Sequence, residues 1–282
     1  MKAVDFKDMA IIERNFFKIL QYGAFDTHFP IEPMSSFKWK RLIQMVEAQG
    51  VVSTFIDGIN KYASGDNLQL PKDIVALIKE KAKHIPASPF DKLPKEIKLS
   101  NSILNHRLQN IIKNEIHAID TSVETIDLLK IIIINSKAML NHGMSLEGII
   151  SLGKYLRASG KGDRIDVLKL EKWISYLFFQ SIAQLQGNIL ISVFGFDQDE
   201  IPFVEEYESR AYKLTMKSIS DLAKDTAQEW HFRQNSLGFV RNNNAVLRRN
   251  LRRSFRYINY FPIETVSNFI NNFTKSLKEI EE

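Results

Sequence analysis

Cysteine is absent from this chain of 282 residues, and its absence excludes three kinds of site. Without thiols the protein can have no disulfide framework, no thiolate metal site and no cysteine nucleophile. The amino-terminal stretch also lacks the unbroken apolar core of a signal peptide, because Asp5, Asp8 and Glu13 interrupt it. A chain without thiols or a signal peptide is compatible with a reducing compartment, and we expect a cytoplasmic protein.

Glycine and proline are scarce, with 12 and 8 residues. This scarcity favours long helices over a many-stranded sheet. Apolar residues recur at spacings of three and four nearly throughout, which predicts an all-α protein of about ten helices in an irregular bundle without a substantial sheet. The four isoleucines that begin at Ile131 could instead form the core of a strand, but the helical pattern on both sides favours a helix.

Three of the prolines lie close together in "HIPASPFDKLP", the best candidate for a linker. We therefore predict an N-terminal helical subdomain at residues 1–84 and a proline-rich linker at residues 85–95. Residues 96–282 would form a C-terminal helical domain that includes a basic amphipathic helix.

Charged residues are missing from the whole stretch between Ile174 and Phe196. Its length would suffice to cross a bilayer, but four amide side chains crowd its middle, and an amide is costly in hydrocarbon. These amides belong to Gln180, Gln184, Gln186 and Asn188. We predict a long buried helix, capped by Asp166, and no membrane span.

The common catalytic signatures are also missing. Asp197 and Asp199 in "DQD" have the spacing of a magnesium-binding pair, but the pattern places them in a loop and not on a strand. "SGKGDR" at residues 159–164 resembles a phosphate-binding loop only superficially, because a helix precedes it and the final Ser or Thr is missing. His106 and His117 share a helix face but lack further ligands. We expect no catalytic residue, no metal and no cofactor, and we leave open whether the chain is an enzyme.

The strongest local feature is a run of arginines near the carboxyl end. Between Trp230 and Ile263 there are seven arginines, no lysine and no acidic residue; the whole chain carries +5, so the remainder carries −2. At about 100° per residue, residues 247–261 separate into an apolar arc and a cationic arc. The apolar arc holds Leu247, Leu251, Phe255, Ile258 and Phe261. We predict an amphipathic helix whose apolar arc packs on the core and whose opposite face is cationic.

This cationic face is the predicted binding site, because the guanidinium fork bonds two oxygens of a carboxylate or phosphate at once. Its residues are Arg241, Arg248, Arg249, Arg252, Arg253 and Arg256. Three interpretations stay open. The acids Glu205, Glu206 and Glu208 could neutralise the face internally, a polyanion (nucleic acid, nucleotide or acidic lipid) could bind it, or an acidic protein partner could bind it.

Four stretches, taken in order, resemble a known family. They are "WKRLIQMVEAQGVVSTFIDGI", "LLKIIIINSKAMLNHGMSLEGIISLGKYLR", "IDVLKLEKWISYL" with "VFGFDQDEIPF", and the arginine segment with "YFPIET". Together they are similar to the uncharacterised nucleotidyltransferase-like proteins of bacteria. The resemblance implies that family's helical scaffold. Its catalytic domain would lie within residues 60–127, where this chain has no strand pattern, glycine-serine turn or carboxylate pair, so no catalytic residue carries over.

Taken together, these features favour a non-catalytic binding or adaptor protein on a nucleotidyltransferase-like helical scaffold, with a cationic helix facing an acidic partner. The alternatives are a nucleotide-binding or nucleic-acid-binding protein, or a residual nucleotidyltransferase. The sequence leaves the identity of the partner and the oligomeric state open.

Overall fold

The computed structural model contains helices and no strand in the residues that it describes, which are 9–65, 68–85, 90, 93–94, 96–144, 146–159, 164–220 and 251–281. The labelled helices are α1 (Ile11–Phe25), α2 (Ser36–Ala48), α3 (Val52–Gly65), α4 (Lys72–Ala82), α5 (Ser102–Ile116), α6 (Val123–Asn141), α7 (Leu146–Ser159), α8 (Val167–Tyr176), α9 (Gln180–Phe194) and α12 (Pro262–Glu281). Residues 210–220 and 251–257 are also helical. The all-α prediction is confirmed, and the 12 helices of the described residues are slightly more than expected.

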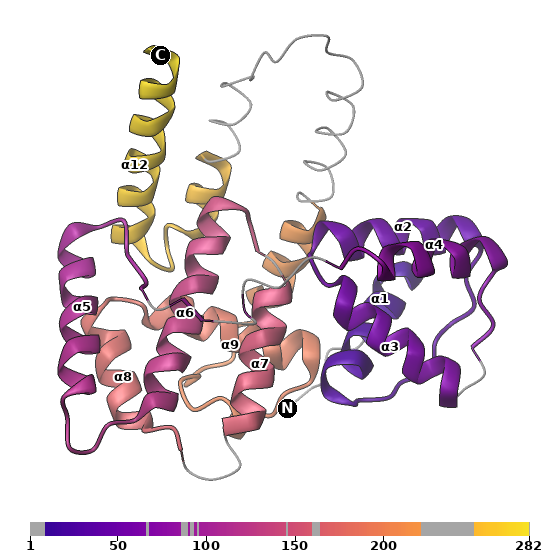
Figure 1. Cartoon of the computed structure of the whole chain (residues 1–282), viewed down its shortest axis with the longest axis horizontal. Coiled ribbons are helices and arrows are strands. Elements are labelled where there is room, and N and C mark those ends of the chain that lie inside the picture. Colours follow the sequence, from indigo (N-terminus) through magenta and orange to yellow (C-terminus); the bar gives the residue numbers. More distant parts are fainter. Residues whose placement is uncertain are drawn as a thin grey trace.

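Helices α1 to α4 form one side of the molecule (Figure 1). Within this group, α1 packs mainly on α3, and two glycines allow the two backbones to touch. A Cβ atom on Gly23 would lie 2.0 Å from the carbonyl oxygen of Thr54, and one on Gly58 would lie 2.3 Å from that of Ile19. Any larger residue at either position would force α1 and α3 apart.

Helix α6 lies at the centre of the other side and packs against α7, α8 and α9. The isoleucine run is helical, as predicted, and Ile132 and Ile133 are completely buried in the core. Buried amides join α6 to its neighbours: the Asn135 side chain donates to the carbonyl of Gly148 over 2.9 Å, and Gln186 of α9 donates to the Ser136 hydroxyl over 3.0 Å. These bonds offset the cost of burying the two NH2 groups, whereas the side-chain oxygen of Asn135 is buried without a hydrogen-bond partner.

The prediction of one long helix through the uncharged stretch is wrong. The chain turns at residues 177–179 and divides the stretch into α8 and α9, and Phe178 adopts the left-handed conformation with φ of 58°. Phe179, which follows, is completely buried. Among the described helices, none has both the length and the apolar character needed to cross a bilayer.

The two sides of the molecule share one apolar core. Helix α1 contacts α7 and α9, and the Gln21 side chain donates to the carbonyl of Val193 over 2.6 Å. The amide of Leu146 similarly donates to the side chain of Gln49 over 3.2 Å. The division into an N-terminal subdomain, a linker and a C-terminal domain stays a prediction.

Helix α12 extends away from the α5–α9 side, with the carboxyl terminus at its far end (Figure 1). The helical residues 251–257, here called the arginine helix, precede it in the chain. Tyr257, at the end of the arginine helix, and Phe261, just before α12, are buried, and the Phe261 ring lies 5.8 Å from that of Phe179. These aromatic contacts hold both helices on the body of the protein.

Candidate functional site

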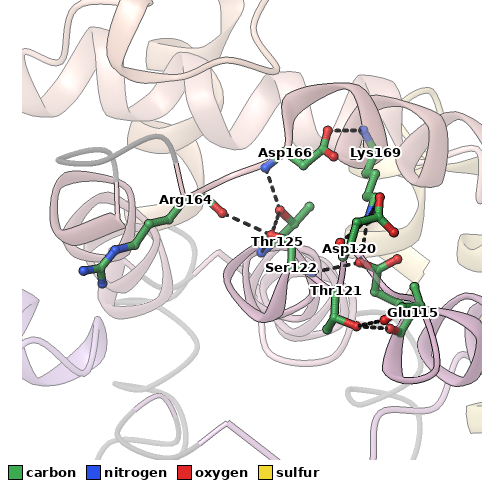
Figure 2. A network of polar contacts seen from close by, with 9 residues as sticks. Glu115, Asp120, Thr121, Ser122, Thr125, Arg164, Asp166 and Lys169 are labelled. Atoms are coloured by element: carbon green, nitrogen blue, oxygen red, sulfur yellow. Dashed lines mark hydrogen bonds and ion pairs between the residues drawn. The ribbon is translucent and has the colours of Figure 1, made fainter.

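The most connected polar cluster joins three helix ends: the end of α5, the start of α6 and the start of α8 (Figure 2). We call it the cap network. The Ser122 hydroxyl bonds that of Thr125 over 2.6 Å, and Thr125 accepts from the amide of Asp166 over 2.8 Å. Ser122 caps α6 by accepting from the amide of Thr125, and Asp166 caps α8 by accepting from the amide of Lys169. The Thr121 hydroxyl donates to the carbonyl of Glu115 over 2.7 Å.

The charged part of the cap network pairs internally. Lys169 lies 2.9 Å from the Glu115 carboxylate and 3.0 Å from that of Asp120. These partners raise the pKa of Lys169, with Glu115 contributing most, and the Lys169 ammonium lowers the pKa of Asp120. Glu115 is buried and also accepts from the amide of Ser122 over 2.9 Å. These mutual bonds account for the charged groups, so the cap network connects helices and offers no reactive group.

The two phosphate- and magnesium-like motifs meet at one cleft of about 750 Å³, which Arg164 and Asp199 both line. The two aspartates do not behave as a magnesium-binding pair would require. Asp197 caps the 3-10 turn Gln198–Glu200, and Glu200 holds Arg157 through two bonds of 2.9 and 3.3 Å. Residues 160–163 of the glycine-rich motif lie outside the described residues.

The two candidate histidines stay apart from acidic ligands. The ring of His106 bonds the side chain of Asn110 over 3.1 Å, and His117 ends α5 at an exposed position. Among the residues that the structure describes, no group of three or more His, Asp or Glu side chains could hold a metal ion.

Of the six predicted binding arginines, the structure describes three. Arg241, Arg248 and Arg249 lie outside the described residues. Arg252 is exposed, whereas Arg253 is half-buried and donates to the carbonyl of Asn141 at the end of α6. Burial and the Arg253 charge together lower the pKa of the neighbouring His142.

The remaining arginine, Arg256, is half-buried beside Tyr257. Burial raises the pKa of Tyr257, and interactions with Ser218 and Arg256 oppose that rise. The acid Glu208, one of three that could neutralise the arginine face, accepts a hydrogen bond from the Tyr260 hydroxyl. Burial and the Glu208 carboxylate raise the pKa of Tyr260.

The apolar arc predicted from the arginine segment is wrong in part. Phe261 is buried as expected, but Leu251 is 40% exposed and Phe255 is 66% exposed. Tyr257 is buried in the core instead, and with the helix in this orientation Arg253 faces α6. The outer surface of the arginine helix therefore combines large apolar side chains with the exposed cation of Arg252.

Helix α12 buries its polar face against the body. Glu264, 1% exposed, accepts from the backbone amides of Ser100 and Asn101 at the start of α5 over 2.6 and 3.0 Å. Burial raises the pKa of Glu264, although the two amides oppose the rise. One turn further on, Asn268 donates to the Asn141 side chain over 3.0 Å.

Further asparagines extend this polar contact around a cleft of about 360 Å³ beside α12. Asn272 also donates to the side chain of Asn141, over 3.1 Å, and Asn271 donates to the carbonyl of Ser100 over 3.2 Å. Lys137 lines the same cleft and donates to the carbonyl of Lys98. The cleft walls are bonded to one another, so they serve to hold α12 in place.

The opposite face of α12 is apolar and points outward. Four large apolar side chains are between 39% and 55% exposed: Ile263, Val266, Ile270 and Phe273. We call them the α12 outer stripe. Amphipathic helices normally bury their apolar face, so α12 is inverted with respect to the body of the protein. The sequence contains this pattern, but its orientation is visible only once Glu264 and Asn268 are placed.

Comparison of the chain with protein-family models, with curated proteins and with solved structures finds no match. The resemblance to nucleotidyltransferase-like proteins therefore stays a prediction based on sequence.

Proposed function

We propose that this protein is a non-catalytic binding protein that docks an acidic protein through the outer surface of the arginine helix. The observation that carries the proposal is the exposure of Leu251 and Phe255 beside the exposed Arg252. A helix that only had to pack on its own core would bury these two apolar side chains. Arginine and aromatic residues are also the types most enriched at the energetic centres of protein interfaces.

The positive charge of the arginine-rich segment indicates that its partner is acidic. Seven arginines without any acidic residue between Trp230 and Ile263 would attract a surface rich in Asp and Glu. In the sequence, Arg248 and Arg249 lie shortly before the exposed Leu251, and they add to the same positive charge. The mixed surface favours a protein over a nucleic acid, because a purely phosphate-binding helix would gain little from an exposed Phe255.

The arginine helix is held firmly enough to present this surface. Arg253 donates to Asn141, Tyr257 and Phe261 are buried, and Tyr260 donates to Glu208. A helix anchored on one face loses little further conformational freedom when a partner binds the other face. Under the family resemblance, this helix belongs to a helical scaffold that no longer carries a catalytic domain.

The test is fluorescence anisotropy with a labelled acidic peptide built from Glu-Glu-Leu repeats. Arg252→Glu is expected to weaken binding about tenfold, because it reverses one exposed charge, and Phe255→Ala to weaken it severalfold. Leu168→Ala is the control, since Leu168 is exposed at a distant position on α8. Equal affinity in the wild type and Arg252→Glu would overturn the proposal.

Two further measurements separate the proposal from its alternatives. Tighter binding to duplex DNA than to the peptide, with an affinity that falls steeply with salt, would replace it with nucleic-acid binding. Thermal stabilisation by ATP with magnesium would replace it with nucleotide binding.

A further inference from the structure

The α12 outer stripe has the spacing of a coiled-coil seam. Ile263, Val266, Ile270 and Phe273 are separated by three, four and three residues, the alternation of a and d positions in a heptad. In the sequence, Leu277 and Ile280 continue the alternation to the end of the helix. A seam of this kind is buried when a second helix lies along it at a small crossing angle.

The inner face of α12 prevents the stripe from turning toward the body. Turning it inward would break the bonds of Glu264 to the amides of Ser100 and Asn101. It would also break the contact between Asn268 and Asn141. The start of α5 would then keep two amides without their acceptor, which is costly when they are buried. Any surface that buries the stripe must therefore lie outside the α5–α9 side of the protein.

The residues beside the stripe indicate which kind of molecule could pack on it. Beside the α12 outer stripe, from Ile263 to Phe273, the flanking heptad positions hold Pro262, Ser267, Phe269 and Thr274, none of which is charged; Glu281, at the far end of the helix, is a charged flanking residue. Two copies of α12 can thus approach without repulsion between like charges, which is the usual obstacle to self-pairing at these positions. The arginines, which would repel a second copy, lie on the preceding helix and not along the seam.

We propose that two copies of this chain pair through the α12 outer stripe and form a two-fold symmetric dimer. The contact is isologous, so each copy offers the same four side chains to the other. This dimer is independent of the proposed function: it uses α12, whereas the acidic protein would bind the arginine helix.

The first experiment is sedimentation of the full chain over a range of concentrations. We expect the wild type to reach twice the chain mass of 32.6 kDa. Ile270→Glu should weaken the dimer by at least about tenfold, because it places a charge in the seam. Ile119→Glu is the matched control, since Ile119 is also an exposed isoleucine but lies in the turn after α5. A wild type that stays monomeric at its highest soluble concentration would overturn the proposal.

A second experiment locates the interface without disturbing the seam. The chain has no cysteine, so Thr274→Cys provides a unique attachment point for a spin label beside the stripe. A helix of 20 residues is about 30 Å long, so labels on paired α12 helices lie within that distance in either orientation. An intercopy distance in that range supports the seam, and a dimer with only longer distances would overturn it. Arg252→Glu should leave the mass unchanged while it weakens peptide binding, which separates failure of this dimer from failure of the proposed function.

Discussion

The cap network and the base of α12 are both polar contacts between helix ends, but they differ in whether the helix that they hold leaves an apolar face exposed. In the cap network, the hydroxyl, amide and charged groups of Glu115, Ser122 and Lys169 bond one another, and the contact is complete within the chain (Figure 2). At the base of α12, Glu264 and Asn268 are equally well bonded, yet they hold a helix whose apolar side faces outward. The comparison shows that a fully hydrogen-bonded polar contact can either join helices within the fold or hold a helix so that its apolar face is exposed.

Removal of a buried hydrogen-bond acceptor should have the largest effects on the free energy of unfolding. The sizes of the two losses rank the regions by their contribution to stability. Glu264→Leu leaves the amides of Ser100 and Asn101 without their acceptor, so we expect a loss of about 3 kcal/mol in the free energy of unfolding. Thr125→Val removes one acceptor from the amide of Asp166 and should cost about 1–2 kcal/mol. Chemical denaturation measures both. Thr125→Ser, which keeps the hydroxyl, is the control, and a larger loss for Thr125→Val than for Glu264→Leu would contradict the ranking.

The two regions should also respond to pH in opposite directions. The pKa of Glu264 is raised by burial, so the protonated form favours folding, and stability should fall as the pH rises above about 4.5 toward the folded pKa. The pKa of Asp120 is lowered by Lys169, so its contribution is present above about 3.8 and disappears as the pH falls below that value. The Asp120 effect should be the smaller one because that side chain is exposed.

Thermal melts of the wild type, Glu264→Gln and Asp120→Asn as a function of pH test this expectation. Glu264→Gln should flatten the profile above pH 4.5 only, and Asp120→Asn should flatten it below pH 3.8 only. The same change of slope in both variants would show that the two carboxylates do not differ as described.

The smallest effect on stability should come from the outward surface itself. Phe255→Ser removes a large apolar side chain that is 66% exposed, so the free energy of unfolding should change by no more than about 0.5 kcal/mol. The matched buried change, Phe261→Ser, should cost about 3 kcal/mol or more. A comparable loss in both variants, measured by urea denaturation, would show that Phe255 is needed by the fold and not for binding.

Local patterns in the sequence were sufficient for the helical class, for the helical state of the isoleucine run that begins at Ile131 and for the capping role of Asp166. They predicted the wrong faces for Leu251 and Phe255, and they did not reveal the turn at Phe178. Helical periodicity states that a helix has an apolar face, but it contains no information about which face meets the core.

The sequence by itself determined that this protein is helical, has no thiol chemistry and concentrates its positive charge in one segment, because these properties depend only on residue type and short-range spacing. Only the tertiary structure decided that α12 turns its polar side inward. Glu264 meets the amide of Ser100 across 164 residues of chain, and Asn268 bonds Ser100 and Asn141 from the same side of α12. Contacts of such range depend on how all the intervening helices pack.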